Sequence, residues 1–408
     1  MSEKRARIVV IGAGQAGASL AARLRALGHV GPLTLVGGET APPYQRPPLS
    51  KAYLKGEMER ERLFLRPPSF YADQEIALET GVMGVAIDRA ARTVTLSDGR
   101  TLAYDMLALT TGSAPRHLPA AMGGDLGGVL TMRGLPDADA LAEFVKPGTR
   151  ALIVGGGYIG LEAAAVLADA RLTVTVIERE PRILARVAAP ETAGYFRDLH
   201  RAHDVSIREG VTLERLTGRE GRVTGGEMAD GSTILAELVL VGIGVTPADE
   251  LARAAGLDIE NGIAVDATGR TSDPAIFAAG DCASFPGPEG RIRLESVPNA
   301  IEHAEATAAA MLGDPAPYVA RPWFWSDQYD VKLQIAGLNT GYDRVITRPG
   351  ARPGGLSVWY FRGSRLISID AMNDPRAYMT AKRWIEAGVS PDPDRVADPA
   401  ADLKDLIP

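Results

Sequence analysis

Two glycine-rich segments carry the spacing that a bound nucleotide phosphate requires. The first has Gly12, Gly14 and Gly17 in a G-x-G-x-x-G pattern directly after the apolar run Arg7–Ile11. The first glycine permits a tight turn, the second lets the backbone approach a pyrophosphate, and the third lets helix and strand pack closely. Free N–H groups at the start of the following helix, which includes Ala16, would face the anion. This segment predicts a dinucleotide-binding site.

The second segment repeats the pattern with Gly155, Gly157 and Gly160. An acidic residue, Glu178, ends the apolar run that follows its helix. A carboxylate there accepts hydrogen bonds from a ribose 2′-OH and repels a 2′-phosphate, so the pattern predicts NADH rather than NADPH.

Two features leave these acidic positions open. Arg179 and Arg182 lie near Glu178, and a solvated strand end is the alternative interpretation of that residue. In the first segment a glycine pair precedes Glu39, which is the candidate for the adenosine ribose.

A third motif lies in the segment 271–283, TSDPAIFAAGDCA. Its short apolar strand leads to Asp281, at the carboxyl edge where open α/β sheets bind ligands. A carboxylate there can hold the hydroxyls of a ribityl chain. Together with Thr110–Arg116, the motif resembles the flavin-binding pattern of flavoproteins with two dinucleotide domains.

These motifs require parallel sheets to position them. Segments 7–24 and 151–167 share one plan of apolar run, glycine loop and alanine-rich helix, and each predicts the start of a βαβ unit. Short strands are expected at Thr93–Leu96 and Thr101–Leu109. After Pro322, aromatic residues and alternating runs predict an α+β region, and the Asp- and Pro-rich tail from Ser390 is expected to be extended.

Composition excludes several classes of protein. The 408 residues are 46% hydrophobic and carry a formal charge of −7, which is ordinary for a globular protein and argues against general nucleic-acid binding. A single cysteine, Cys282, excludes a two-cysteine redox centre and suits a reducing compartment. We expect no membrane span, no secretory signal and a cytoplasmic location.

Further segments extend the pattern over nearly the whole chain. They are YQRPPLSKAYL at 44–54, GGGYIGLE at 155–162, ESVPNAIEHA at 295–304 and PWFWSDQYD at 322–330. With them the chain resembles the FAD-containing, NADH-dependent ferredoxin reductases. The resemblance implies a glutathione-reductase-like α/β fold with two Rossmann-type domains. These are a discontinuous FAD-binding domain (1–113 and 246–321) and a NAD-binding domain (114–245), followed by an α+β C-terminal interface domain (322–408).

The resemblance also implies site residues. Lys51, Glu162 and Trp325 are the candidate catalytic residues, with Lys51 near the flavin ring and paired to Glu162. Val297 would offer its N–H to the ring at the positive end of a helix. The FAD candidates are Gly12, Gly14, Ala16, Gly17, Glu39, Arg46, Lys51, Arg133, Asp281, Val297 and Trp325. The NAD candidates are Gly155, Gly157, Tyr158, Ile159, Gly160, Glu162, Glu178 and Gly242.

The implied reaction passes a hydride from NADH to FAD and then single electrons to a two-iron two-sulfur ferredoxin that feeds an oxygenase. A cytochrome haem monooxygenase is expected, with an aromatic-ring-hydroxylating dioxygenase as the alternative. Such chemistry needs no general base and no metal, so His303 is interpreted as structural. Ten basic and five acidic residues in 321–383 suggest an acidic partner, with Arg344, Arg348, Arg352, Lys382 and Arg383 as candidate contacts.

Three other flavoprotein functions are alternatives. Disulfide or peroxide reduction needs a cysteine near the flavin, and the segment 43–54 has none. A membrane quinone reductase needs an amphipathic C-terminal helix, which the acidic tail does not predict. An NADH-controlled signalling flavoprotein shares both glycine motifs and stays a second hypothesis.

Overall fold

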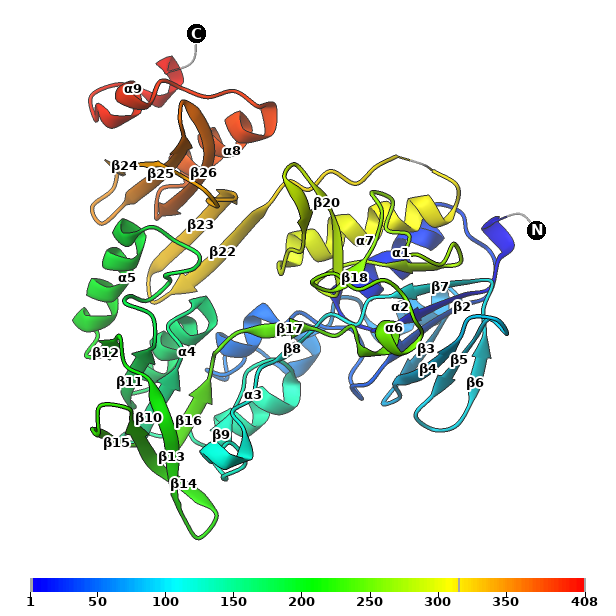
Figure 1. The fold of residues 1–408 in the computed structure, drawn as a ribbon, viewed down its shortest axis with the longest axis horizontal. Helices are drawn as coiled ribbons and strands as arrows, with labels where there is room; N and C mark the ends of the chain where they lie inside the picture. Colours follow the sequence, from blue (N-terminus) through cyan, green and yellow to red (C-terminus); the bar gives the residue numbers. More distant parts are fainter. Residues whose placement is uncertain (1–2, 315, 407–408) are drawn as a thin grey trace. The chain divides into compact units, whose positions relative to one another are not determined.

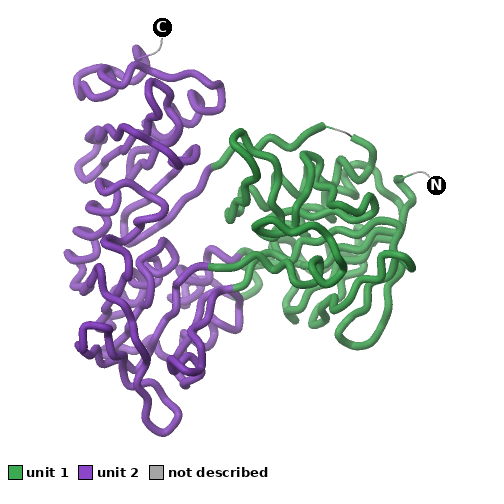
Figure 2. The backbone as a smooth tube through the Cα atoms, in the orientation of Figure 1, with its two compact units in different colours: residues 1–45, 60–114, 245–322 green, residues 46–59, 115–244, 323–408 purple. Residues whose placement is uncertain are grey.

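The computed structural model describes residues 3–314 and 316–406. The chain divides into two compact units, coloured separately in Figure 2. Unit 1 comprises Met1–Gln45, Arg60–Ala114 and Val245–Pro322, and unit 2 comprises Arg46–Glu59, Pro115–Gly244 and Trp323–Pro408. The division into three domains stays a prediction. Residues 46–59, assigned above to the FAD-binding domain, belong to unit 2.

Unit 1 is built on a parallel sheet with the strand order β19-β7-β1-β2-β3. All four residues of the apolar run that forms β1 are buried, as expected for a strand covered on both faces. The strands are β1 (Ile8–Ile11), β2 (Leu33–Gly37), β3 (Ile76–Thr80), β7 (Met106–Leu109) and β19 (Ile276–Ala278).

Helices and a second sheet cover the two faces of this parallel sheet. α1 (Gln15–Ala26) and α7 (Val297–Met311) pack together over one face (Figure 1). The antiparallel sheet β4-β5-β6 packs on the other face, where Val94 and Leu96 share a core with Val9 and Ile11. Its strands are β4 (Gly84–Asp88), β5 (Thr93–Leu96) and β6 (Thr101–Ala103).

One expected strand of unit 1 is divided. The run 101–109 forms β6 and β7, which belong to different sheets. Asp105 lies at the break, where its carboxylate accepts a hydrogen bond from the backbone N–H of Arg7 at 2.7 Å. The smaller elements are η1 (Glu3–Arg5), η3 (Arg60–Leu63), α2 (Pro68–Asp73), β8 (Ser113–Pro115), β17 (Val245–Pro247), α6 (Glu250–Ala254), β18 (Ile263–Ala264), β20 (Ala283–Gly287) and β21 (Gly290–Ile292).

Unit 2 contains a second parallel sheet, in the order β12-β11-β10-β16-β9. Successive residues of β10 alternate between two cores: Ile153 packs with α4 and α5, whereas Leu152 packs with the antiparallel sheet β13-β14-β15. The strands are β9 (Val129–Leu130), β10 (Arg150–Val154), β11 (Thr173–Glu178), β12 (Ser206–Glu209), β13 (Leu213–Arg219), β14 (Arg222–Met228), β15 (Thr233–Leu235) and β16 (Leu238–Val241). The helices are η2 (Pro47–Ser50), η4 (Ala120–Met122), α3 (Leu135–Ala142), α4 (Tyr158–Asp169) and α5 (Pro190–Ala202).

The C-terminal part of unit 2 is an antiparallel sheet, in the order β22-β23-β26-β25-β24, with helices that follow it. Its strands are β22 (Trp323–Gln328), β23 (Val331–Gly337), β24 (Arg344–Pro349), β25 (Leu356–Arg362) and β26 (Arg365–Met372). The helices are α8 (Pro375–Ala387), α9 (Pro393–Ala397) and η5 (Leu403–Asp405). The fold is thus the α/β class with two Rossmann-type sheets and an α+β C-terminal region.

The expectation of an extended tail is wrong for the described residues of 390–408. α9 and η5 place Val396, Leu403 and Leu406 in the core of the C-terminal region. Arg348, a candidate for the partner surface, is only 9% exposed. Its guanidinium donates hydrogen bonds to the carbonyls of the tail, those of Val396, Asp398, Pro399 and Ala401. Apolar spacing and one buried arginine therefore outweigh the polar composition of this segment.

Candidate functional site

The first glycine loop of unit 1 leaves space where a ligand phosphate is expected. Gly12 has a φ of +112°, and a Cβ on it would lie 2.2 Å from the carbonyl oxygen of Thr110. A Cβ on Gly17 would lie 1.9 Å from the carbonyl oxygen of Gly12. A Cβ on Gly14, the N-cap of α1, would meet no atom within 4 Å. Packing therefore requires Gly12 and Gly17, whereas Gly14 opens the approach to the free N–H groups of α1.

The Asp281 loop lies against the start of α1. It follows β19, which pairs with β7, so it emerges at the carboxyl edge of the same parallel sheet as the glycine loop. Ser113 Oγ donates a hydrogen bond to Asp281 Oδ2 at 2.9 Å. Gly280 comes so close to α1 that a Cβ on it would lie 2.9 Å from the Cβ of Ala16. The carboxylate is thus held beside the glycine loop, as a flavin ribityl site requires.

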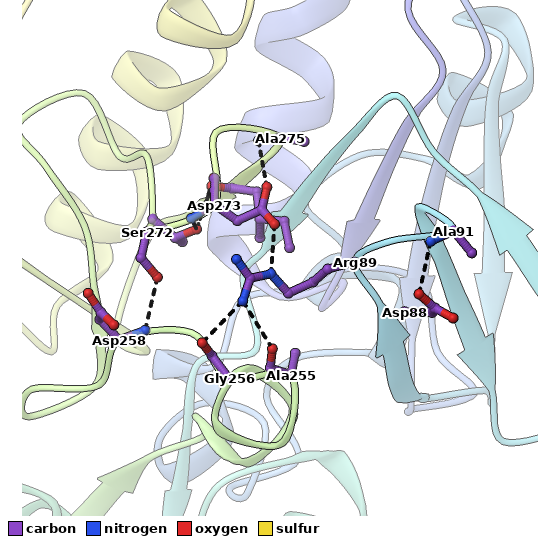
Figure 3. Close-up of polar contacts among 11 residues, drawn as sticks. Asp88, Arg89, Ala91, Ala255, Gly256, Asp258, Ser272, Asp273 and Ala275 are labelled. Carbon is purple, nitrogen blue, oxygen red and sulfur yellow. Dashed lines mark hydrogen bonds and ion pairs between the residues drawn. The ribbon is translucent and has the colours of Figure 1, made fainter.

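An arginine anchors the segment that leads into this loop. Arg89, directly after β4, pairs its Nε with Asp273 Oδ2 at 2.7 Å (Figure 3). Its Nη1 also donates to the carbonyl oxygens of Ala255 and Gly256, at 3.5 and 3.2 Å. Asp273 Oδ1 accepts a hydrogen bond from the N–H of Ala275, just before β19. The Arg89 guanidinium therefore connects the end of β4 to the segments 255–256 and 273–275 of unit 1.

Two further candidates of unit 1 have identifiable partners. Glu39 lies just after β2, and its carboxylate accepts a hydrogen bond from the hydroxyl of Tyr44. Val297 is the first residue of α7, where a backbone N–H has no partner within the helix. Ser296 caps this helix by accepting from the N–H of Asn299 at 3.3 Å.

The glycine loop of unit 2 repeats the geometry of the first. Gly155 has a φ of +111°, and a Cβ on it would lie 2.4 Å from the carbonyl oxygen of Gly242. A Cβ on Gly160 would lie 2.3 Å from the carbonyl oxygen of Gly155. Gly157, the N-cap of α4, again has open space around its missing Cβ. Both loops therefore fit a dinucleotide phosphate.

Glu178, at the end of β11, has its carboxylate fixed by two backbone groups. Oε2 accepts from the N–H of Gly156 at 2.7 Å, and Oε1 accepts from the N–H of Glu180 at 2.8 Å. The neighbouring Arg182 is committed to the fold, because it donates to the carbonyls of Ile183, Ala185 and Ala188. Arg182 is therefore not free to bind a phosphate next to Glu178. Arg179 is 75% exposed and pairs with the neighbouring Glu180 at 3.1 Å.

Lys51 and Glu162 form an ion pair inside unit 2, between Nζ and Oε2 at 3.0 Å. Glu162 is 8% exposed on α4, and Lys51 follows directly after η2, which packs on α4. Ser326 Oγ donates to the other carboxylate oxygen, Oε1, at 2.7 Å. Burial raises the pKa of Glu162, and Lys51 and Ser326 offset part of that rise.

The other candidates of unit 2 lie on α4, on β22 and in the segments before η2 and α3. Ile159, in the first turn of α4, is 49% exposed, and the buried hydroxyl of Tyr158 has no hydrogen-bond partner among the described residues. Trp325 is half-buried on β22, with its ring centroid 5.6 Å from that of Trp323. Arg46 Nη1 donates to the carbonyl oxygen of Arg133 at 2.6 Å.

Three buried polar residues that lead to Glu162 are not among the site residues that the sequence predicts. Ser326 and Gln328 are fully buried on β22, and His200 is fully buried on α5. The first two occupy alternate positions of a strand, so the period-2 pattern of WFWSDQ could have revealed two polar residues on its inner face. His200 carries no such signal.

Two remaining candidates for chemistry, His303 and Cys282, are buried. His303 is fully buried, and burial lowers its pKa to about 3, as a structural histidine would show. Cys282 is also fully buried. Within residues 3–314 and 316–406, no group of three or more His, Cys, Asp and Glu side chains could hold a metal ion, and no helix has the length and apolarity to cross a membrane.

Comparison with known proteins defines the class to which this fold and these sites belong. Residues 6–304 match the pyridine nucleotide-disulphide oxidoreductase family, and residues 323–407 match the reductase C-terminal family. The chain therefore belongs to the pyridine nucleotide-disulphide oxidoreductases and, within them, to the ferredoxin reductases. It is an oxidoreductase whose cofactors are FAD and NAD(H).

Particular relatives match over the full length. A ferredoxin–NAD(P)+ reductase from Sphingomonas is 42% identical, covering 100% of this chain and 99% of its own. Putidaredoxin reductase from Pseudomonas putida is also 42% identical, covering 98% of this chain and 96% of its own. The crystal structure of a covalent putidaredoxin reductase–putidaredoxin complex superposes with a TM-score of 0.94 at 41% identity, covering 98% of each chain.

Proposed function

We propose that this protein takes two electrons from NADH and passes them singly to a two-iron two-sulfur ferredoxin. When bound, FAD accepts a hydride and returns its electrons one at a time. Oxidation of one NADH then reduces two ferredoxins and releases one proton. The observation that supports this function best is the pair of glycine loops, each with a middle glycine that faces open space.

The residues of unit 1 bind and orient FAD. The N–H groups of α1 bind the pyrophosphate, Glu39 binds the adenosine ribose, and Asp281 binds ribityl hydroxyls. Val297 offers its N–H at the positive end of α7, which favours negative charge on the ring. Arg46, Arg133 and Trp325 complete the proposed set of FAD-binding residues.

The residues of unit 2 bind NADH and tune the reaction. The N–H groups of α4 bind the pyrophosphate, and Glu178 binds the adenosine ribose. Tyr158, Ile159 and Gly242 lie on the same loop edge and contact the coenzyme. Lys51 acts as the cation beside the flavin, and Glu162 holds it in place. Because Glu178 repels a 2′-phosphate, NADH is the preferred coenzyme.

The partner is a ferredoxin in the cytoplasm that serves an oxygenase, and we favour a cytochrome haem monooxygenase. Relatives named as ferredoxin and putidaredoxin reductases support this partner. Disulfide reduction lacks support despite the family name, because the single cysteine, Cys282, is buried without a second thiol.

Anaerobic stopped-flow absorbance tests the proposal. Purified holoprotein is mixed with NADH, with NADPH, and then with a two-iron ferredoxin. We expect fast flavin bleaching by NADH, much slower bleaching by NADPH, and onward reduction of the ferredoxin. Bleaching without onward transfer would favour the signalling flavoprotein, and a protein purified without flavin would refute the proposal.

A further inference from the structure

A line of buried polar side chains in unit 2 ends at Glu162. The hydroxyl of Tyr329 lies 3.1 Å from Nδ1 of His200, and Nε2 of His200 lies 2.8 Å from Oε1 of Gln328. Nε2 of Gln328 donates to Ser326 Oγ at 3.2 Å, and Ser326 Oγ donates to Glu162 Oε1 at 2.7 Å. The line joins β22, α5 and α4 without a break.

The direction of every bond follows from the charge of Glu162. A carboxylate only accepts, so the Ser326 hydroxyl donates to it and accepts from the amide nitrogen of Gln328. The amide oxygen of Gln328 must then accept from Nε2–H of His200. This fixes the neutral tautomer of His200, whose Nδ1 accepts from the hydroxyl of Tyr329. All the donors therefore point toward Glu162.

Because the line is buried, the shared direction of its hydrogen bonds affects the charge of Glu162. Ser326, Gln328 and His200 have no exposed surface, and hydrogen bonds in such a medium polarise one another. Burial lowers the pKa of His200 to about 4, so it stays neutral near pH 7 and keeps this tautomer. A buried carboxylate without such donors would take up a proton.

We infer that His200 is a positioning residue, which acts through Gln328 and Ser326 to keep Glu162 ionised and thereby keep Lys51 charged and in place. The inference rests on the proposed function, in which Lys51 and Glu162 act on the flavin. A packing role alone would satisfy the same polar atoms. It would not require the donors to share a direction or to end at a carboxylate that is paired with a lysine.

Other charged groups face this line and determine the direction in which each substitution should shift the pKa of Glu162. Asp327 on β22 opposes the ionisation of Glu162, whereas Lys51 favours it. Further along α4, Asp169 pairs with Lys55 at 2.9 Å and raises the pKa of Tyr329 in addition to burial. His203 stacks on Tyr329, with ring centroids 3.7 Å apart.

The test measures the charge of Glu162 directly in the holoprotein, without turnover. Infrared spectra across a pH series are recorded for each protein and for the same protein carrying Glu162→Gln, and their difference isolates this carboxyl. We expect Ser326→Ala to raise the midpoint of the Glu162 titration by about one pH unit, since it removes a hydrogen bond to a charged acceptor. Asp327→Asn should move the midpoint in the opposite direction.

The His200 variants separate a positioning role from packing. His200→Phe fills the space without a donor and should raise the midpoint in the same direction as Ser326→Ala, by a smaller amount. His200→Gln restores an N–H donor and should return the midpoint toward the wild-type value. Ser368→Ala, which removes a buried serine that donates to the carbonyl oxygen of Ala336 on the same sheet, is the matched control and should have no effect.

An unchanged midpoint in His200→Phe would overturn the inference, whether or not Ser326→Ala moves it. The pH dependence of flavin bleaching by NADH, measured on the same variants, tests the proposed function separately. If the infrared midpoint moves while the bleaching profile does not, Glu162 is tuned as inferred but does not act on the flavin.

Discussion

At the scale of single residues, the two partners of the Lys51–Glu162 pair differ in how well each tolerates loss of the other. The Glu162 side chain is 10% exposed and that of Lys51 is 20% exposed, so the lysine reaches solvent more easily. Ser326 still donates to residue 162 when Lys51 is removed, but it cannot neutralise a charge. Leaving the carboxylate without its partner should therefore destabilise the protein more than leaving the lysine without its partner.

We expect Lys51→Met to lower the free energy of unfolding by about 2–4 kcal/mol and Glu162→Gln by about 1–2 kcal/mol. The loss in Lys51→Met should shrink as the pH falls, because the buried carboxyl then takes up a proton. Urea denaturation followed by circular dichroism measures both variants. Equal losses, or a larger loss in Glu162→Gln, would contradict this account.

A second buried carboxyl, Asp370 on β26, links the C-terminal sheet to α5. Its Oδ2 accepts hydrogen bonds from Thr192 Oγ1, at 2.7 Å, and from the hydroxyl of Tyr360. The same tyrosine hydroxyl accepts from the N–H of Ala189 at 2.9 Å, just before α5. Burial raises the pKa of Asp370 to about 6, and the two hydrogen bonds offset part of that rise.

Folding therefore favours the protonated form of Asp370, and its contribution to stability is lost as the pH rises from about 4 to about 6. Asp370→Asn cannot titrate. We expect the variant to gain about 2–3 kcal/mol of stability relative to wild type between pH 4 and pH 7. Urea denaturation midpoints at several pH values measure the difference, and a constant difference would show that Asp370 does not titrate in this range.

At the scale of elements, the glycines of each loop serve two separable purposes. Gly160 lets α4 pack against its loop, whereas Gly157 faces open space. A side chain at position 160 should therefore destabilise the fold, and a side chain at position 157 should weaken coenzyme binding.

We expect Gly160→Ala to destabilise the protein by at least about 2 kcal/mol. Gly157→Ala should leave stability within about 0.5 kcal/mol and raise the KM for NADH about tenfold. Gly194→Ala is the control, since its missing Cβ on α5 also has open space and it lies outside the loop. Thermal melting and steady-state kinetics separate the two effects, and a normal KM in Gly157→Ala would refute the assignment of this loop.

Arg348 holds the C-terminal tail through several carbonyls, alongside the ion pair between Arg376 and Asp402. Arg348 donates to the carbonyls of four tail residues, and its loss removes this donor from groups that are partly buried. The carbonyl oxygen of Asp398 keeps a hydrogen bond from the N–H of Ala401 at 3.2 Å. Arg344, on the same strand, pairs with the exposed Asp394 at 2.6 Å. Arg348 is buried, whereas the side chain of Arg344 is exposed to solvent.

We expect Arg348→Met to speed hydrogen exchange of residues 393–406 by at least tenfold and to destabilise the C-terminal region by about 2 kcal/mol. Arg344→Met removes only an exposed ion pair and should cost less than about 0.5 kcal/mol. Hydrogen exchange with mass spectrometry measures both, and equal effects would contradict a special role for Arg348.

Elements with a periodic signal were predictable from the sequence, and contacts between distant segments were not. Uniformly apolar strands and glycine loops predicted the two parallel sheets. The line from His200 to Glu162 brings together residues on α5, β22 and α4, and no local pattern reports such a meeting. The tail was predicted wrongly because its Asp and Pro residues outnumber the three apolar residues that it buries. With the tail included, residues 321–408 carry 12 basic and 11 acidic residues, so the positive excess expected for the partner surface largely disappears.

At the scale of the whole molecule, each unit has hydrophobic cores of its own. The two cores of unit 1 contain residues of its parallel sheet, and the three cores of unit 2 contain none of them. A ligand that binds one unit should therefore stabilise that unit selectively.

We expect NAD+ at about 100 times its Kd to add about 2.7 kcal/mol of protection to unit 2. In hydrogen exchange, slowing should centre on residues 154–162, 178–180 and 242, and the loop 12–17 of unit 1 should keep its rate. The same experiment without NAD+ is the reference. Equal slowing in both glycine loops would show that the coenzyme does not discriminate between them.

The bonds around Glu178 have a consequence for redesigning coenzyme choice. Replacing Glu178 to admit NADPH would strip two backbone N–H groups of their acceptor, and Arg182 could bind a phosphate only by abandoning three carbonyls. The two carboxylate oxygens of Glu178 thus act on both the coenzyme preference and the shape of the loop. A switch to NADPH that recruits Arg182 therefore requires compensating changes in the turn that Arg182 holds, as well as a replacement for Glu178.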